Sequence, residues 1–291
     1  MASDYSRTCA SPDSIQTGDA PIVSETCEVY VWGSNSSHQL VEGTQEKILQ
    51  PKLAPSFSDA QTVVVCVSAG YRHSAAVTED GELYTWGEGD FGRLGHGDSN
   101  SRNIPTLVKD ISNVGEVSCG SSHTIALSKD GRTVWSFGGG DNGKLGHGDT
   151  NRVYKPKVIE ALQGMFIRKV CAGSQSSLAL TSTGQVYAWG CGACLGCGSS
   201  EATALRPKLI EELAATRVVD ISIGDSHCLA LSHDNEVYAW GNNSMGQCGQ
   251  GNSTGPITKP KKVSGLDGIA IQQISAGTSH SLAWTALPRD R

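Results

Sequence analysis

The sequence predicts an all-β fold made of repeated four-stranded blades, and the spacing of three motifs supports this prediction. An aromatic residue followed by glycine ends a short alternating segment five times, at steps of 54, 51, 52 and 51 residues. A proline follows each of these glycines after 17 to 19 residues, and a run of small residues ending in glycine comes next. So regular a period indicates a repeat protein, and short strands without helical periodicity favour a β-propeller.

Each repeat is expected to contribute four strands in a fixed order. The segment Leu83–Trp86 alternates in polarity and forms one strand, followed by a glycine-rich loop. The proline strand belongs at the outer edge, because proline lacks a ladder donor. The small residues of Val65–Gly70 suit the crowded position near the axis, and His73 opens the next strand. Asp80 and Gly81 then turn the chain into the next unit, and Asp-Gly predicts a type I′ hairpin there.

The aromatic residue of each repeat is expected to pack between neighbouring blades. These residues are Trp32, Trp86, Phe137, Trp189 and Trp240. Each would bury a large apolar area, so truncation of one would cost about 3–5 kcal/mol.

The repeats divide the chain into three parts. Residues 1–28 are polar and lack periodicity, which predicts a disordered arm or linker. Residues 29–285 hold the propeller repeats, and residues 286–291 form a tail or a domain boundary. No segment approaches the ~18 consecutive apolar residues that a transmembrane helix needs.

The net charge and the positions of the cysteines indicate which kind of partner and which cellular compartment to expect. The net charge of −6 comes without a basic stripe, so no nucleic-acid partner is expected. The ten cysteines occupy different positions in different repeats. This placement is unlike the disulfide framework of a secreted protein, so we expect reduced thiols and a cytoplasmic location.

The segment Leu83–Gly131 resembles the regulator-of-chromosome-condensation repeat. It holds an aromatic-x-Trp-Gly strand, a Gly-x-Leu-Gly-x-Gly-Asp loop, a proline strand, a Gly-x-x-His segment and an Asp-Gly turn. The resemblance extends from Val29 to about Thr285 and is most like an RCC-like domain of the giant HERC class of HECT ubiquitin ligases. In those ligases a separate HECT domain carries the catalytic cysteine, and no such domain is present here.

The number of blades departs from the family pattern. Propellers of this family usually have seven blades, whereas this chain holds about five blades' worth of sequence. We favour an arc of a seven-bladed ring, whose ends would be unpaired edges. The alternative is a closed five-bladed ring, in which Ile269–Thr285 pairs with Val29–Leu53.

The loop Gly138–Lys144 has the glycine and lysine spacing of a phosphate-binding loop. Leu145 stands where Ser or Thr would hold magnesium, and Gly87–Arg93 repeats the same loop in the preceding unit. The loop is therefore interpreted as the repeat turn, and no nucleotide or other cofactor is expected.

Cys191, Cys194 and Cys197 have a spacing that resembles part of a zinc or iron–sulfur site. A closed site needs a fourth ligand, and Cys248 in the matching loop of the next repeat is the candidate. The interpretation that we favour is that these small residues fill a turn two residues shorter than its counterparts.

One histidine per repeat recurs at a single position, except in the third copy. The residues at this position are His73, His123, Ser176, His227 and His280. Because ligands converge whereas these histidines are spread over the blades, a structural hydrogen bond is the favoured interpretation. No Ser/His/Asp, Cys/His or paired-carboxylate arrangement emerges, so no catalytic residue is assigned.

The resemblance favours a non-catalytic propeller that presents a loop rim to protein partners within a larger ubiquitin ligase. The alternative is guanine-nucleotide exchange on a small GTPase of the Ran, Arf or Rab type, although no insertion here matches the β-wedge of the family's founding member. The expected partner interface lies in the two least degraded loops and comprises Asp90, Phe91, Arg93, His96, Asp141, Asn142, Lys144 and His147. The two loop histidines are expected to be solvated, and Phe91 is either a partner anchor or a lid on its own turn.

Overall fold

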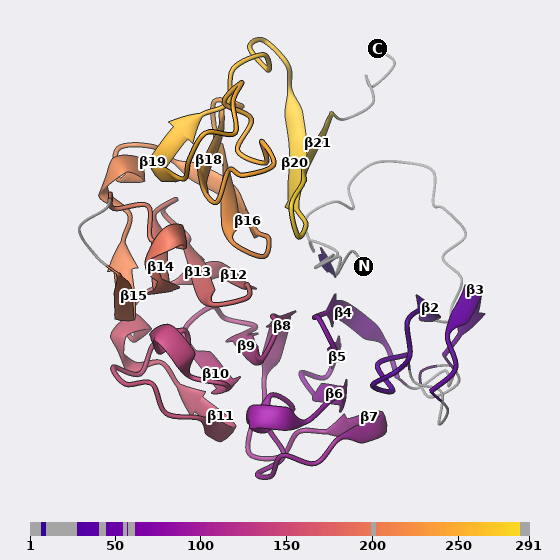
Figure 1. Cartoon of the computed structure of the whole chain (residues 1–291). Coiled ribbons are helices and arrows are strands. Elements are labelled where there is room, and N and C mark those ends of the chain that lie inside the picture. The colour runs from indigo at the N-terminus through magenta and orange to yellow at the C-terminus, as the bar shows by residue number, and fades with distance from the viewer. Residues whose placement is uncertain are drawn as a thin grey trace, which may run out of the picture.

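The chain folds into an open ring of antiparallel sheets (Figure 1). The computed structural model describes residues 7–9, 28–40, 45–54, 57, 62–198 and 202–285. Within this part of the chain, every sheet consists of antiparallel strands, and the helical elements are single 3-10 turns. The all-β expectation is therefore confirmed.

Four sheets are complete blades. The first contains β4 (Val64–Ala69), β5 (His73–Thr78), β6 (Leu83–Gly87) and β7 (Arg102–Leu107). The second contains β8 (Val114–Cys119), β9 (His123–Ser128), β10 (Val134–Gly138) and β11 (Val153–Val158). The third contains β12 (Ile167–Ala172), β13 (Ser176–Thr181), β14 (Val186–Cys191) and β15 (Thr203–Leu209). The fourth contains β16 (Val218–Ile223), β17 (His227–Ser232), β18 (Val237–Gly241) and β19 (Ile257–Lys262).

The small-residue strand of each blade lies nearest to the axis, and the proline strand lies outermost. Figure 1 shows β4, β8, β12 and β16 around the centre of the ring and β7, β11, β15 and β19 on its outside. This order follows from the sequence, because a strand with a proline tolerates only an edge position.

The ring stays open between its two ends. Two further sheets have only two strands each: β2 (Tyr30–Gly33) with β3 (Ile48–Leu53), and β20 (Ile271–Ala276) with β21 (Ser281–Thr285). They lie on opposite sides of the opening in Figure 1. The arc that we favoured is therefore the observed architecture, and the closed five-bladed ring is not formed.

The core lies between the blades, where four of the five recurrent aromatic residues are buried. Trp86, Phe137, Trp189 and Trp240 are at most 3% exposed. Trp32 differs, because it is 59% exposed. It belongs to the half-blade β2–β3 at the open end, where no described residue covers its ring. The prediction of inter-blade packing is correct for the four and wrong for Trp32.

The N-terminal stretch contains one strand that the sequence did not predict. β1 (Arg7–Cys9) pairs antiparallel with the free edge of the inner strand β4. An unpaired inner edge offers a row of backbone donors and acceptors, so even a short polar segment can pair with it. Residues 1–6 and 10–27 of the expected arm, and residues 286–291, lie outside the described residues.

The hairpins between β5 and β6 and between their counterparts are not of type I′. The amide of Gly81 donates to Thr78 O over 3.0 Å, and only Gly81 has a positive φ, of 85°. Type I′ requires positive φ at both central residues, whereas a type I turn followed by a left-handed glycine matches this pattern. Asn235 takes the glycine position in the fourth blade with a φ of 63°.

The described cysteines are mostly free thiols. Seven are free: Cys119, Cys171, Cys191, Cys194, Cys197, Cys228 and Cys248. Cys66 is disulfide-bonded, so the expectation of reduced thiols is wrong at this position.

Candidate interaction rim

The loops after β6, β10 and β14 form one edge of the ring, which we call the loop rim. They carry the 3-10 turns η3 (Asp90–Gly92), η4 (Asp141–Gly143) and η6 (Gly192–Cys194). Phe91 and Asn142 occupy the same place and both adopt left-handed backbone, with φ of 67° and 61°. The glycine that follows is obligatory, because a Cβ at Gly92 would lie 2.9 Å from Tyr154 Cα.

Arg93 and Lys144 do not belong to the surface of the rim. Their exposed fractions are 3% and 0%. Arg93 Nη1 donates to Ser121 O in the next blade over 2.7 Å. Lys144 Nζ donates to Ser122 Oγ over 2.6 Å and to Gln175 Oε1 of the next blade over 3.0 Å. Burial lowers the pKa of Lys144 to about 8. Both cations therefore satisfy polar groups between blades and are not available to a partner.

The two loop histidines are held by hydroxyl groups. His96 Nε2 lies 2.9 Å from Thr85 Oγ1, and this hydroxyl donates to Leu94 O over 2.6 Å. Because the hydroxyl proton points to the carbonyl, the imidazole must donate from Nε2. His147 and Ser136 repeat the arrangement at 2.8 Å. Desolvation lowers the pKa of both histidines, so the expectation of solvated turn residues is wrong.

Six of the eight expected residues remain at least partly at the rim surface. Asp90 and Asp141 are exposed, and the half-buried residues are Phe91, His96, Asn142 and His147. The Phe91 ring lies between two guanidinium groups, 5.5 Å from Arg93 and 4.6 Å from Arg152. Such cation–π contacts fix the ring over its own turn. The structure thus favours the lid over the anchor, and the exposed charged groups here are the carboxylates of Asp90 and Asp141 and the guanidinium of Arg152.

The recurrent histidines join neighbouring blades. His73 Nε2 lies 2.9 Å from Thr124 Oγ1, whose proton goes back to Arg93 O over 2.7 Å. A histidine of one blade therefore contacts a hydroxyl of the next blade, and that hydroxyl donates to a backbone carbonyl in the loop of the histidine's own blade. We call this arrangement the histidine staple. It recurs between His123 and Ser177 at 2.8 Å.

His227 and Ser281 form the third histidine staple, at 2.9 Å. In all three staples the histidine Nδ1 is buried and has no hydrogen-bond partner among the described residues. Desolvation lowers the pKa of these histidines, to about 4 for His227. The interpretation of the histidines as structural is confirmed. Their partner is the hydroxyl residue that directly follows the recurrent histidine position of the next repeat, and the sequence analysis did not identify it.

The boundary between the third and fourth blades replaces the staple with sulfur and aliphatic groups. Ser176 stands in the histidine position, and Cys228 stands in the hydroxyl position. The Cys228 thiol lowers the pKa of Cys194, which occupies the place of Arg93 and Lys144 in its loop. Cys194 O also accepts from Trp240 Nε1 over 2.9 Å. These contacts explain the cysteine at this position as packing.

The remaining cysteines of this motif do not extend it into a metal centre. Cys191 and Cys197 are half-buried, and burial raises the pKa of Cys248 to about 11. Among the described residues, no three His, Cys, Asp or Glu side chains are placed to hold one metal ion.

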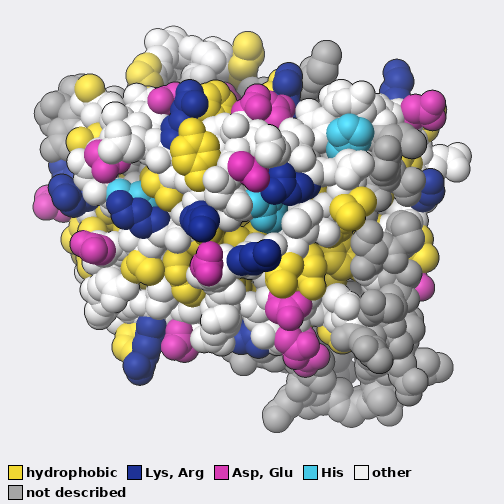
Figure 2. All heavy atoms as spheres, turned by 90° about the horizontal axis from the view of Figure 1, so that it is seen from below, with side chains coloured by type: hydrophobic (Ala, Val, Ile, Leu, Met, Phe, Trp, Pro, Cys, Tyr) yellow, Lys and Arg dark blue, Asp and Glu magenta, His cyan; other side chains and the backbone are white. Residues whose placement is uncertain are grey.

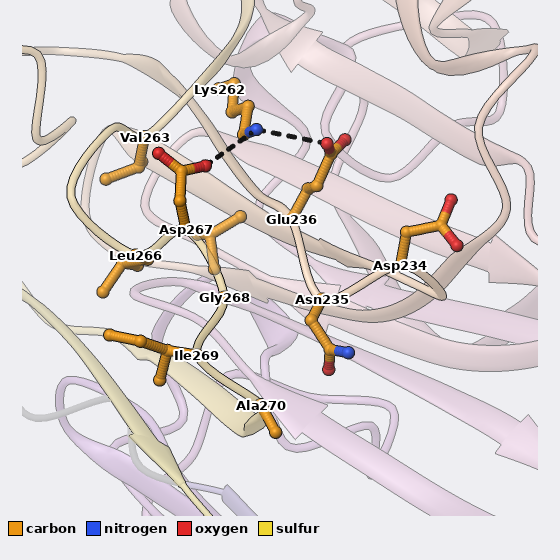
Figure 3. A pocket seen from close by; sticks show the side chains of 11 residues that line it. Asp234, Asn235, Glu236, Lys262, Val263, Leu266, Asp267, Gly268, Ile269 and Ala270 are labelled. Atoms are coloured by element: carbon orange, nitrogen blue, oxygen red, sulfur yellow. Dashed lines mark ion pairs between the residues drawn. The ribbon is translucent and has the colours of Figure 1, made fainter.

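A cavity of about 250 Å³ lies on the opposite edge of the ring, between the β17–β18 turn and the loop after β19 (Figure 3). Lys262 Nζ sits between Glu236 Oε1 at 3.2 Å and Asp267 Oδ1 at 3.0 Å. Leu266 and Ile269 supply an apolar wall. The single cation is thus neutralised within the cavity itself.

The face drawn in Figure 2 carries no single-sign patch. Basic and acidic side chains are interspersed, and hydrophobic side chains lie between them. Mixed charge with apolar gaps suits contact with another protein better than contact with a polyanion. In the described part of the chain, no helix is long and apolar enough to cross a membrane.

Comparison with known proteins identifies the repeat. The family model for the regulator of chromosome condensation (RCC1) repeat matches residues 28–77, 80–127, 130–180, 183–231 and 234–284. The chain belongs to the RCC1 repeat family. Its matches agree with the observed blades: each runs from an outer strand pair into the inner pair of the following blade.

The curated relatives are mostly much longer than this chain. E3 ubiquitin-protein ligase HERC2 of Mus musculus and of Homo sapiens are each 44% identical over 271 residues, covering 90% of this chain and 6% of the ligase. The ultraviolet-B receptor UVR8 of Arabidopsis thaliana is 34% identical over 224 residues, covering 76% of this chain and 50% of the receptor.

Two solved RCC1-type structures have the same fold. Human WBSCR16 superposes with a TM-score of 0.77 at 24% identity, covering 89% of this chain and 67% of that one. Prp20p of Saccharomyces cerevisiae, a structure described with its binding to Gsp1p and histones, superposes with a TM-score of 0.78 at 21% identity, covering 88% and 64%. At these identities the likeness shows the fold alone.

Proposed function

We propose that this chain is a non-catalytic interaction domain of a HERC-type ubiquitin ligase and that it presents the loop rim to protein partners. The observation that carries the proposal is the 44% identity to HERC2 over 90% of the chain. The ligase activity of such a protein would lie in its other parts, because this chain corresponds to 6% of the relative. We place the domain in the cytoplasm, a proposal supported by the seven free thiols.

The geometry supports a scaffold role for the blades and a contact role for the rim. Inter-blade contacts of Arg93, Lys144 and the histidine staples hold the loops at fixed positions. Rigid loops lose little conformational entropy when a partner binds. The exposed carboxylates of Asp90 and Asp141 occupy the same loop position in the first two blades, so a partner with basic groups at a matching spacing fits this edge.

A photo-crosslinking amino acid at position 90 or 141 tests this proposal in cells. We expect the probe to form crosslinks to defined proteins. In the double variant Asp90→Arg, Asp141→Arg the probe is placed on a neighbouring rim residue, and we expect these crosslinks to be lost. The matched control is Asp80→Arg with Asp234→Arg, which makes the same charge change on the exposed turns of the opposite edge. Equal loss in both variants would contradict a role of the rim.

The same protein preparation tests the rival function. Release of a fluorescent guanine nucleotide from Ran, Arf and Rab GTPases is measured with and without the chain. We expect release at the spontaneous rate. Acceleration of one GTPase that is lost in the rim variant and retained in the control would replace the adaptor proposal with nucleotide exchange.

A further inference from the structure

The cavity on the edge opposite to the loop rim lies at the boundary between the fourth blade and the half-blade β20–β21 (Figure 3). At the boundaries between complete blades, the turn of one blade is bonded to the first residue of the next inner strand. These bonds join Val114 N to Gly81 O at 3.0 Å, Ile167 N to Gly131 O at 2.8 Å and Val218 N to Gly184 O at 3.0 Å. In the described part of the chain, no such bond joins Ile271 N to Asn235 O. The cavity therefore lies where a contact of the repeat is missing.

The loop that leads into β20 explains why this boundary stays open. The loops that lead into β12 and β16 form the 3-10 turns η5 (Glu160–Leu162) and η7 (Glu211–Leu213), whose last residue is a leucine at most 2% exposed. In the loop before β20, Gly265 stands within the corresponding stretch and has a φ of 90°, which a helical turn does not contain. The leucine that follows it, Leu266, is only half-buried. The loop thus leaves part of the boundary unfilled.

Arginine side chains of the chain itself lie at the two preceding boundaries on this edge. The guanidinium of Arg132 lies 5.1 Å from the centroid of the Phe166 ring, and Phe166 directly precedes β12. Arg217 directly precedes β16 and packs over the turn of the third blade, where a Cβ on Gly184 would lie 2.9 Å from Arg217 Cγ. Ala270 holds the same position before β20 and has no side chain beyond Cβ. The cavity thus occupies a place that the chain fills with arginine at its other boundaries.

The charges around the cavity are suited to a cation. Three carboxylates, those of Asp234, Glu236 and Asp267, line it together with a single ammonium group, that of Lys262. Lys262 offsets one of the three negative charges, so an excess of negative charge remains. The side chain of Asp267 is 72% exposed, so its carboxylate is accessible to a cation that arrives from solvent.

We propose that this cavity binds an arginine side chain of a partner protein. The guanidinium would be held by the carboxylate of Asp267 and the backbone carbonyl of Asn235, and its aliphatic stem would lie along Leu266 and Ile269. Arginine suits the site better than lysine, because its planar array of five donors reaches a carboxylate and a carbonyl together. A volume of about 250 Å³ is below the ~300–1,000 Å³ of pockets for drug-sized ligands and suits one side chain. Because the cavity lies on the other edge of the ring, the proposal is independent of the function proposed for the loop rim.

Titration of the whole ¹⁵N-labelled chain with N-acetyl-arginine methylamide, followed by amide chemical shifts, tests the proposal. We expect saturable shifts at Asn235 and Gly268 and none at Gly81, which lies in the corresponding turn of the first blade. The same compound with citrulline in place of arginine keeps the shape without the charge and is expected not to bind. Equal shifts with both compounds, or no shift with either, would overturn the proposal.

Asp267→Asn removes the carboxylate that would hold the guanidinium. We expect it to weaken binding of the arginine compound about three- to fivefold, as for the loss of one solvent-exposed ion pair. Asp80→Asn is the matched control, because it removes the same charge from an exposed turn on the same edge of the ring. It is expected to bind as the unchanged chain does, and equal affinity of the two variants would contradict the role of Asp267.

Ala270→Arg supplies the arginine from the chain itself, at the position that Arg217 holds before β16. We expect this variant to lose binding of the arginine compound, because its own side chain fills the cavity. Ala215→Arg adds the same side chain to the exposed loop before β16 and is expected to leave binding unchanged. Undiminished binding by Ala270→Arg would contradict the placement of the ligand in this cavity.

Discussion

His123 of the second blade and Ser177 of the third are joined across the blade boundary, with 2.8 Å between Nε2 and Oγ. Ser177 Oγ donates in turn to Lys144 O in the second blade, over 2.7 Å. The boundary is thereby held by buried polar contacts inside an apolar core.

Removal of one staple should destabilise the fold. His123→Ala leaves a cavity and removes the hydrogen bond that Ser177 Oγ accepts from His123 Nε2, so we expect the free energy of unfolding to fall by about 1–3 kcal/mol. Urea denaturation measures the change. His233→Ala, at a side chain that is 63% exposed, is the control and should shift stability by less than about 0.5 kcal/mol. Equal shifts would show that the staple contributes nothing.

Acidification should unfold the protein through the same histidines. Their folded-state pKa values lie below the ordinary value of about 6.5, and that of His227 is about 4. Between these values the unfolded chain binds more protons, so stability falls as pH drops from about 6.5 towards 4. The slope is at most about 1.4 kcal/mol per pH unit for each histidine.

Denaturation midpoints across this pH window check the histidine contribution. His227→Gln removes one titrating group, so its stability should depend less steeply on pH than that of the unchanged chain. An unchanged slope would assign the acid sensitivity to other groups.

Equivalent tryptophans should differ sharply in their contribution to stability. Trp240→Ala removes a buried ring and the hydrogen bond to Cys194 O, and is expected to cost about 3–5 kcal/mol. Trp32→Ala removes a ring that is 59% exposed and should cost less than about 1 kcal/mol at concentrations where the chain is monomeric. Thermal melts of both variants decide the matter, and similar losses would mean that the open end is covered in solution.

Lys144 should act on stability, whereas Asp141 should act on binding. Lys144→Ala strips hydrogen bonds from Ser122 and Gln175, and we expect a loss of about 1–3 kcal/mol. Lys144→Gln should recover part of it, because Gln39 and Gln247 occupy the same loop position. Asp141→Ala should change the unfolding midpoint little. A stable Lys144→Ala variant would return this lysine to the list of candidate contact residues.

Ile223 fills the volume of the missing third histidine. A Cβ at Gly173 would lie 2.8 Å from Ile223 Cδ1, whereas at Gly120 it would lie 3.0 Å from His123 Cε1. Ser176→His should therefore overpack this boundary and destabilise the fold by about 1–3 kcal/mol. Adding Ile223→Ala should relieve part of that cost, and a double-mutant cycle measures the coupling. Additive losses would show that the two side chains do not compete for one space.

The sequence determined the blade because each strand carries a residue with one tolerable location. Proline fixed the outer strand, and the recurrent aromatic residues fixed the inter-blade core. The same reasoning failed for Trp32, since burial there depends on a neighbour that the arc does not supply. It also failed for β1, which pairs with an edge that is visible only once β4 has been placed.

The residues of the loop rim were predicted less well, because charged residues in the loops were assumed to be exposed. Arg93 and Lys144 look like surface residues, yet their long side chains reach backbone and amide groups of the next blade. The sequence does contain a sign that this position is internal, because Gln39 and Gln247 occupy it in other repeats. A position that accepts both glutamine and a cation suggests a polar partner inside the protein. The cation–π contact between Arg152 and the Phe91 ring joins two blades, so it could not be predicted from the sequence.

The open ring changes where the molecule begins to melt. In a closed propeller every blade has two neighbours, so the first unfolding step is equally costly around the circle. Here the half-blades β2–β3 and β20–β21 have one neighbour each, and nearest-neighbour contacts dominate the stability of repeat proteins. Amide hydrogen exchange should therefore be fastest in the two half-blades and slowest in the second and third blades. Local unfolding would then begin at the two ends of the arc.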